Sequence, residues 1–138
     1  RDRESLGAAE TVAGIDAAQG SFALILEAAG GASLKGAIER VAAGGTIVIF
    51  GNSSGERTAI DFRDFALHQN ARVQSFFYFT SEPEERFAPD LALLVGLVAD
   101  GSLRPRIVEA GWREIAATGP RLLGRQIAGK AVFHIDDA

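Results

Sequence analysis

The sequence lacks several features, and each absence removes a class of chemistry. It contains no cysteine, so disulfide bonds, thiolate zinc sites and cysteine nucleophiles are excluded. No apolar run approaches the roughly 20 residues of a membrane-spanning helix, and we expect no signal peptide. A net charge of −4 and a pI near 5.2 leave no basic stripe for nucleic acid. These absences are compatible with a cytoplasmic protein.

Histidine and methionine are also scarce. His68 and His134 are far apart, and no cysteine or carboxylate accompanies them at the spacing of a metal site. We therefore expect no metal ligands here. Methionine is absent and the chain begins at Arg1, which is not the small residue that permits removal of an initiator methionine. We accordingly expect the chain to be a piece of a longer protein.

The most informative segment that is present runs from Gly44 to Gly55 and reads GGTIVIFGNSSG. A continuous apolar run between turn signals predicts a strand that is covered on both faces, as in a parallel sheet. Asn52, Ser53 and Ser54 then follow this strand, where ligands bind in open α/β sheets. An ordinary glycine-rich strand exit would give the same pattern, so the segment alone leaves both interpretations open.

The preceding residues complete a strand–helix–strand unit. A second apolar strand is predicted over residues 21–29 and ends at Gly30 and Gly31. Between the two strands, apolar residues recur at the spacing of one helix face, namely Leu34, Ala37, Ile38 and Val41. This order is the βαβ unit of a parallel sheet. A short strand over residues 10–13 is also predicted.

The rest of the chain alternates between predicted helices and strands. In order these are a helix over residues 61–69, a strand over 72–79, a helix ending at Gly101, a strand over 106–109, a helix around 112–123 and a strand over 131–135. Ser81 and Glu84 have the spacing of a capping box, which predicts the start of the helix that ends at Gly101. Pro89 is expected to kink or interrupt that helix.

Taken together, these segments resemble the C-terminal part of the medium-chain dehydrogenase/reductase family. The resemblance is to its quinone-reductase-like branch, often described as zinc-type alcohol dehydrogenase or zinc-binding dehydrogenase. The matching segments are residues 22–31, 41–45, 49–55, 79–87, 101–105 and 124–135, and the most specific is Phe50-Gly51-Asn52-Ser53-Ser54-Gly55. The family's GxGxxG fingerprint is absent, because no two glycines here are separated by one residue.

The resemblance implies an α/β fold. It would be a partial Rossmann fold, a doubly wound parallel sheet without its first two strands, followed by a C-terminal helix and strand that return to the catalytic domain. Residues 1–103 would be the C-terminal part of the cofactor-binding domain, and residues 104–138 the segment on the catalytic-domain side. Without the first strand, a flat apolar edge is bare, so we expect a homo-oligomer formed through edge strands.

The resemblance also implies a function for the parent protein: hydride transfer between NADP(H) and a quinone, enone or alcohol/carbonyl substrate, with NAD(H) left open. The positions matched to cofactor contacts are Ala28, Ala29, Gly30, Gly51, Asn52, Ser53, Phe79 and Lys130. No catalytic residue is assigned, and the segment alone is expected to be inactive because the pyrophosphate-binding helix terminus is absent. The alternatives are a methyltransferase-like Rossmann domain and a non-catalytic α/β dimerisation module.

Overall fold

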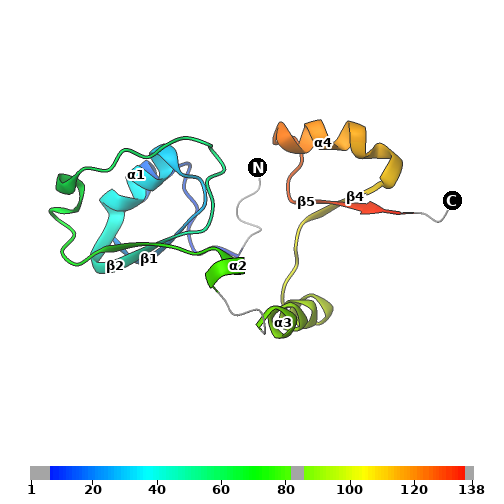
Figure 1. Cartoon of the computed structure of the whole chain (residues 1–138), viewed down its shortest axis with the longest axis horizontal. Helices are drawn as coiled ribbons and strands as arrows, with labels where there is room; N and C mark the ends of the chain where they lie inside the picture. The colour runs from blue at the N-terminus through cyan, green and yellow to red at the C-terminus, as the bar shows by residue number, and fades with distance from the viewer. Residues whose placement is uncertain (1–6, 82–85, 136–138) are drawn as a thin grey trace. The chain divides into compact units, whose positions relative to one another are not determined.

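The computed structural model describes residues 7–81 and 86–135, which belong to two compact units (Figure 1). The first unit runs to Ser81 and the second contains the described residues from Arg86 onward. The predicted boundary between residues 103 and 104 concerns the domains of a parent protein and stays a prediction. None of the described helices is long and apolar enough to cross a membrane.

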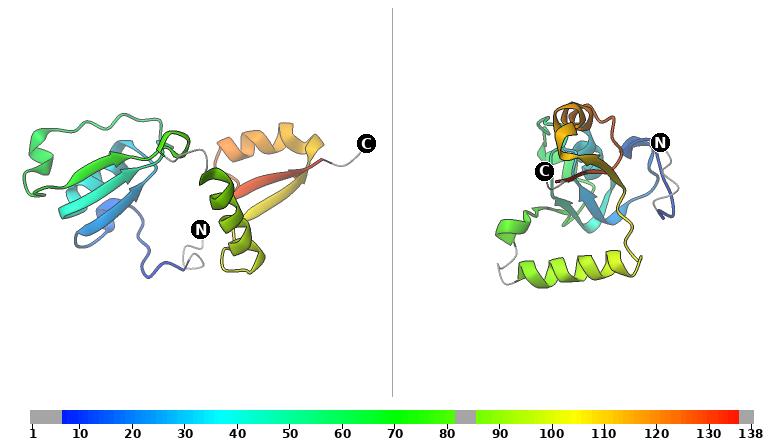
Figure 2. Two further views of the ribbon diagram at one scale, coloured as in Figure 1. Left: turned by 60° about the horizontal axis from the view of Figure 1, so that its bottom comes forward. Right: turned by 90° about the vertical axis from the view of Figure 1, so that its right-hand side faces the viewer.

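The first unit contains a parallel three-stranded sheet. Its strands are β1 (Phe22–Glu27), β2 (Val41–Ile49) and β3 (Arg72–Ser75), arranged in the order β1-β2-β3. Helix α1 (Gly31–Arg40) joins β1 to β2, and the three arrows point the same way (Figure 2). The predicted βαβ unit is therefore confirmed. In the structure β2 begins directly after α1, and its pairing with β1 is irregular before Thr46, where the glycine pair at residues 44–45 lies.

The core of this unit lies between α1 and one face of the sheet. The buried cluster consists of Leu34, Ala37, Ile38, Val41 and Ile47. The helical residues in it share the face that their spacing predicts, while Ile47 comes from the middle of β2. Complete burial of each large aliphatic side chain stabilises the fold by about 1.5–3 kcal/mol. This packing fixes α1 against the sheet and so fixes the turn that precedes the helix.

The opposite face of the sheet is exposed, which corrects the expectation that the strand before Asn52, now β2, is covered on both faces. Leu24 and Leu26 of β1 are 59% and 65% exposed, and Phe50 at the end of β2 is 52% exposed. Leu26 pairs in register with Val48, which pairs with Gln74, so these residues share the exposed face. An apolar run reveals apolar side chains on both faces, but not what covers each face.

Three further expectations for the first unit are wrong. Residues 10–13 form no strand, and the helix expected over residues 61–69 is reduced to the 3-10 turn η3 (Phe62–Phe65). A short η2 turn (Ile15–Ala17) precedes β1 instead. Strand β3 ends at Ser75 and the aromatic residues after it turn into the single helical turn α2 (Tyr78–Ser81). Aromatic residues have high strand propensity, but propensity is outweighed here by local turn hydrogen bonds such as Thr80 N to Phe77 O at 2.9 Å.

The second unit contains a long helix and a second βαβ unit. Its elements are α3 (Phe87–Ala99), β4 (Ile107–Gly111), η5 (Trp112–Glu114), α4 (Ile115–Leu123) and β5 (Lys130–His134). Strands β4 and β5 pair in parallel. Pro89 lies in the first turn of α3, where its missing N–H is tolerated, so the expected interruption does not occur. The capping box at Ser81 and Glu84 lies outside the described residues in part, because residue 84 is not described.

Candidate functional site

Two loops meet at the carboxyl edge of the first sheet. The loop after β1 contains residues 28–30, and the loop after β2 contains residues 50–56. Ser53 N donates to Ala28 O and Ser54 N to Ala29 O, both at 2.9 Å. Phe50 N donates to Glu27 O at the same distance, which extends the strand ladder. The backbones of the two predicted binding loops are therefore joined directly.

Two glycines allow the loops to approach this closely. Gly30 has φ +75° and ψ −165°, a conformation that is essentially restricted to glycine. A Cβ atom at Gly30 would collide with Oδ1 of Asn52. At Gly31, with φ +54°, a Cβ atom would lie 2.6 Å from Oε2 of Glu56. The absence of these two Cβ atoms leaves room for the side chains of the second loop beside the start of α1.

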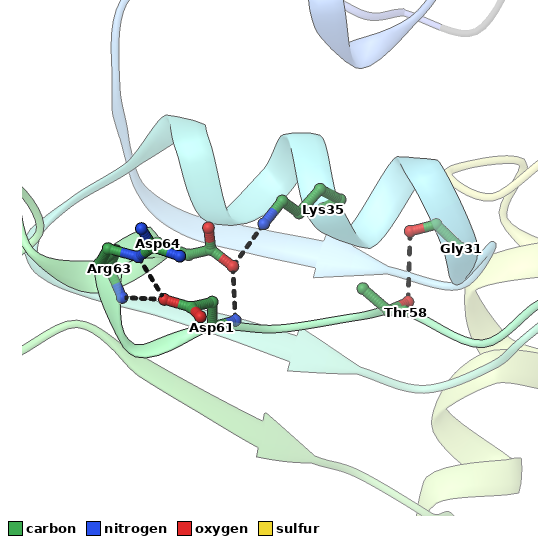
Figure 3. Close-up of polar contacts among 6 residues, drawn as sticks. All are labelled: Gly31, Lys35, Thr58, Asp61, Arg63 and Asp64. Carbon is green, nitrogen blue, oxygen red and sulfur yellow. Dashed lines mark hydrogen bonds and ion pairs between the residues drawn. The ribbon is translucent and has the colours of Figure 1, made fainter.

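A cavity of about 390 Å³ lies at this junction. It is lined by residues from both loops, from α1, from the end of β2 and from the segment that follows the second loop, namely Gly30, Leu34, Ile49, Gly51, Asn52, Glu56, Arg57, Thr58 and Ile60. The Thr58 hydroxyl donates to Gly31 O at 3.2 Å (Figure 3). The Ser54 hydroxyl donates to Oδ1 of Asn52 at 3.3 Å and accepts from Glu56 N at 3.1 Å. The cavity thus combines one apolar wall with amide, hydroxyl and charged groups.

A carboxylate network anchors the segment that follows the cavity to α1 (Figure 3). Asp64 forms an ion pair with Lys35 of α1 and accepts from Asp61 N at 2.8 Å. Asp61 accepts from both the backbone N–H and Nε of Arg63, at 2.9 and 3.0 Å. Hydrogen bonds from the Arg63 side chain and backbone lower the pKa of Asp61. The Asp61 N–H, followed by Lys35, lowers the pKa of Asp64.

Glu27 is a functional candidate that the sequence reasoning missed. It is 4% exposed, at the end of β1. Its Oε1 accepts from Ala29 N at 2.9 Å, and both carboxyl oxygens accept from Gly30 N, at 3.2 and 3.1 Å. The signal in the sequence that could have indicated it is a single carboxylate between an apolar strand and the Ala-Ala-Gly-Gly segment that follows. An isolated charge there is costly to bury unless it is hydrogen-bonded.

A second cavity, of about 590 Å³, lies on the exposed face of the same sheet. Its lining is apolar and aromatic, and comprises Leu26, Val48, Phe50, Phe76, Phe77, Tyr78 and Phe79. The Phe79 ring is 70% exposed and makes edge contacts with Phe77 and Tyr78, with ring centroids 5.8 and 6.0 Å apart. Phe79 therefore lines a different cavity from Asn52.

The eight predicted cofactor contacts divide into groups. Gly30, Gly51 and Asn52 line the smaller cavity, while the carbonyls of Ala28 and Ala29 and the N–H of Ser53 join its two loops. Phe79 lines the aromatic cavity. Lys130 is in the second unit and is exposed at the start of β5, where its N–H donates to Arg106 O at 2.9 Å.

No cluster of three or more histidine, cysteine or acidic side chains that could hold a metal ion occurs within residues 7–81 and 86–135. The polar side chains at the smaller cavity are the amide of Asn52, the hydroxyl of Thr58, the guanidinium of Arg57 and the carboxylate of Glu56. Such groups are suited to hydrogen bonding with an organic ligand.

No family model and no curated protein matches the sequence. Solved structures do match. A quinone oxidoreductase from Pseudomonas syringae pv. Tomato DC3000 has a TM-score of 0.68 at 18% identity, over 83% of this chain and 36% of that chain. E. coli K-12 YhdH, solved with bound NADPH, has a TM-score of 0.67 at 20% identity, over 96% of this chain and 42% of that chain. CurA from Vibrio vulnificus, in complex with NADPH, has a TM-score of 0.63 at 16% identity, over 86% of this chain and 38% of that chain.

The resemblance stated from the sequence is confirmed at the level of the fold. The chain has the α/β fold, with parallel strands, of the C-terminal part of quinone oxidoreductases and their structural relatives. It spans about two fifths of the length of these matches or less. Identities of 14–20% among the matches carry the comparison no further than the fold.

Proposed function

We propose that this chain is the C-terminal part of a medium-chain dehydrogenase/reductase, and that it contributes part of the cofactor site of a cytoplasmic, NADP(H)-dependent oxidoreductase. The substrate of the whole protein would be a quinone, an enone or an alcohol/carbonyl compound. One observation carries the proposal: the Gly30 turn and the residue 51–53 loop enclose a cavity at the carboxyl edge of a parallel sheet. The NADPH-bound neighbours of the same fold support the choice of cofactor.

The cavity residues fit the nicotinamide and ribose end of such a cofactor. A volume of about 390 Å³ lies within the range of small-molecule sites. Gly30 leaves room for the Asn52 side chain at the sheet edge, and Asn52 and Thr58 offer hydrogen-bonding groups to an amide or a sugar hydroxyl. Leu34 and Ile49 exclude water from one wall.

In this proposal the nicotinamide supplies the hydride chemistry, and the residues of this chain bind and orient it. We expect the 138-residue chain to have no oxidoreductase activity by itself. Its sequence contains no GxGxxG motif, the motif whose backbone N–H groups grip the pyrophosphate in a Rossmann fold.

Ligand titration of the chain, followed by thermal shift and by NADPH fluorescence, tests the proposal. We expect a response to NADPH and to NADH, which share the nicotinamide and ribose end, and none to S-adenosylmethionine. Asn52→Ala should weaken NADPH binding by roughly tenfold, the value of one hydrogen bond in a site. Gln69→Ala removes an exposed amide that does not line the cavity and should have no effect. A response to S-adenosylmethionine alone would support a methyltransferase-like domain, and no response to any ligand would support a dimerisation module.

A further inference from the structure

Glu27 has an environment that ordinary strand packing does not explain. Among the described residues, Glu27 and Thr118 are the buried polar or charged ones. The Glu27 carboxyl group packs against the turn that leaves β1, and its oxygens accept hydrogen bonds from backbone N–H groups of that turn. A carboxylate with two accepting oxygens suits this position, because the N–H groups of Ala29 and Gly30 both face it.

The turn held by Glu27 is the same turn that holds the second loop. The carbonyls of Ala28 and Ala29 accept from Ser53 N and Ser54 N. Gly30, held through its own N–H, is the backbone against which the Asn52 side chain rests. A continuous set of hydrogen bonds and contacts thus leads from the Glu27 carboxyl group to the residues that line the smaller cavity.

We propose that Glu27 is a positioning residue of this site. Its carboxyl group fixes the turn at residues 28–30, and this turn determines where Asn52 lies in the cavity. The effect of Glu27 on ligand binding rests on the proposed function, whereas its effect on the loop after β2 does not. Glu27 itself is buried beneath the turn and does not line the cavity.

Glu27→Gln tests this role, because the substitution keeps the size of the side chain. One accepting oxygen is replaced by an NH₂ group, which would oppose the N–H of Gly30. We expect hydrogen–deuterium exchange of residues 51–55 to become about tenfold faster, as for the loss of one charge-assisted hydrogen bond. Exchange in the middle of β2, at Ile47, should not change. Glu39→Gln makes the same chemical change at an exposed position on α1 and should leave both regions unchanged.

Two results would overturn the proposal: unchanged exchange at residues 51–55 in E27Q, or an equal increase throughout the first unit, which would indicate a general role in stability. If E27Q does not fold, Glu27→Asp retains the charge with a shorter reach and allows the same comparison.

NADPH titration then separates this proposal from the proposed function. We expect E27Q to bind NADPH about tenfold more weakly than the unsubstituted chain and E39Q to bind it equally. If the unsubstituted chain does not bind NADPH, the proposed function fails while the exchange result still decides the role of Glu27. If it binds NADPH and E27Q binds with the same affinity, the positioning role in ligand binding is overturned.

Discussion

Substitution of Gly30 by alanine is the most direct perturbation of the loop junction. The backbone N–H that Glu27 accepts from is kept, so the change adds only a methyl group. The new alanine would have to adopt φ +75° and ψ −165°, and its methyl group would meet Oδ1 of Asn52. Two separate effects are therefore expected, one on the backbone and one on the cavity.

The structure allows the two effects to be separated in magnitude. A non-glycine residue in this backbone region costs about 1–3 kcal/mol of folding free energy. Crowding against a packed neighbour adds about 1–3 kcal/mol where the neighbour cannot move. Gly20 provides the matched control, because it also has a positive φ (+79°) but a Cβ atom there would meet nothing within 4 Å. Gly20→Ala should therefore show the cost of a positive φ without the crowding.

Urea unfolding and NADPH titration of both variants provide the assay. We expect Gly30→Ala to lose about 1–3 kcal/mol more unfolding free energy than Gly20→Ala, or to lose NADPH affinity instead if Asn52 moves aside. Gly20→Ala should retain its affinity. Equal stability and equal NADPH affinity in the two variants would refute the close approach of Gly30 to Asn52.

Three further predictions concern the first unit. Ile38→Ala, at a completely buried core position, should lower the unfolding free energy by about 2–5 kcal/mol in urea titration; a loss below about 1 kcal/mol would contradict the core assignment. The pKa values of Asp61 and Asp64 are lowered from 3.8, so their stabilisation is present above pH 3.8 and is lost as the pH falls through the folded-state values. The urea midpoint should therefore fall more between pH 5 and pH 3 in the unsubstituted chain than in an Asp61→Asn/Asp64→Asn double variant. An equal fall of the midpoint in the two proteins would rule out a stabilising role for these carboxylates. Ser75→Pro, which we expect to disrupt pairing at the β3 edge, should shift sedimentation velocity profiles towards the monomer if self-association uses that edge. An unchanged profile would count against this edge.

The βαβ unit could be predicted from the sequence because its signals are strong and local. Leu34, Ala37 and Ile38 repeat at helical spacing, and the apolar runs on either side of them are too short for buried helices. The same reasoning placed Asn52 after a strand. The structure of the residues after Ser75 was harder to predict, because a run of aromatic residues has the composition of a strand whether or not a partner strand is there to pair with it.

The sequence could not predict which cavity each site residue would line. Position after a strand indicates the carboxyl edge of the sheet, but the face depends on whether a residue is odd or even along the strand. Ile49 points to the α1 side and Phe50 to the exposed side, one residue apart. Glu27 was missed for a related reason, since only the folded turn brings two backbone N–H groups onto its carboxyl oxygens.

The division between the two cavities limits how a single ligand can use the predicted contacts. Asn52 and Phe79 line cavities that flank the end of β2 from opposite faces of the sheet. A ligand that contacts both must therefore cross the carboxyl end of β2 near Phe50 and Gly51. A ligand that stays on the α1 side contacts Asn52 and Thr58 but not the aromatic residues. Comparison of Asn52→Ala with Phe79→Ala in NADPH binding thus distinguishes the two arrangements. Loss of NADPH affinity in both variants requires a ligand that crosses the end of β2. Loss of affinity in Asn52→Ala alone confines the ligand to the smaller cavity.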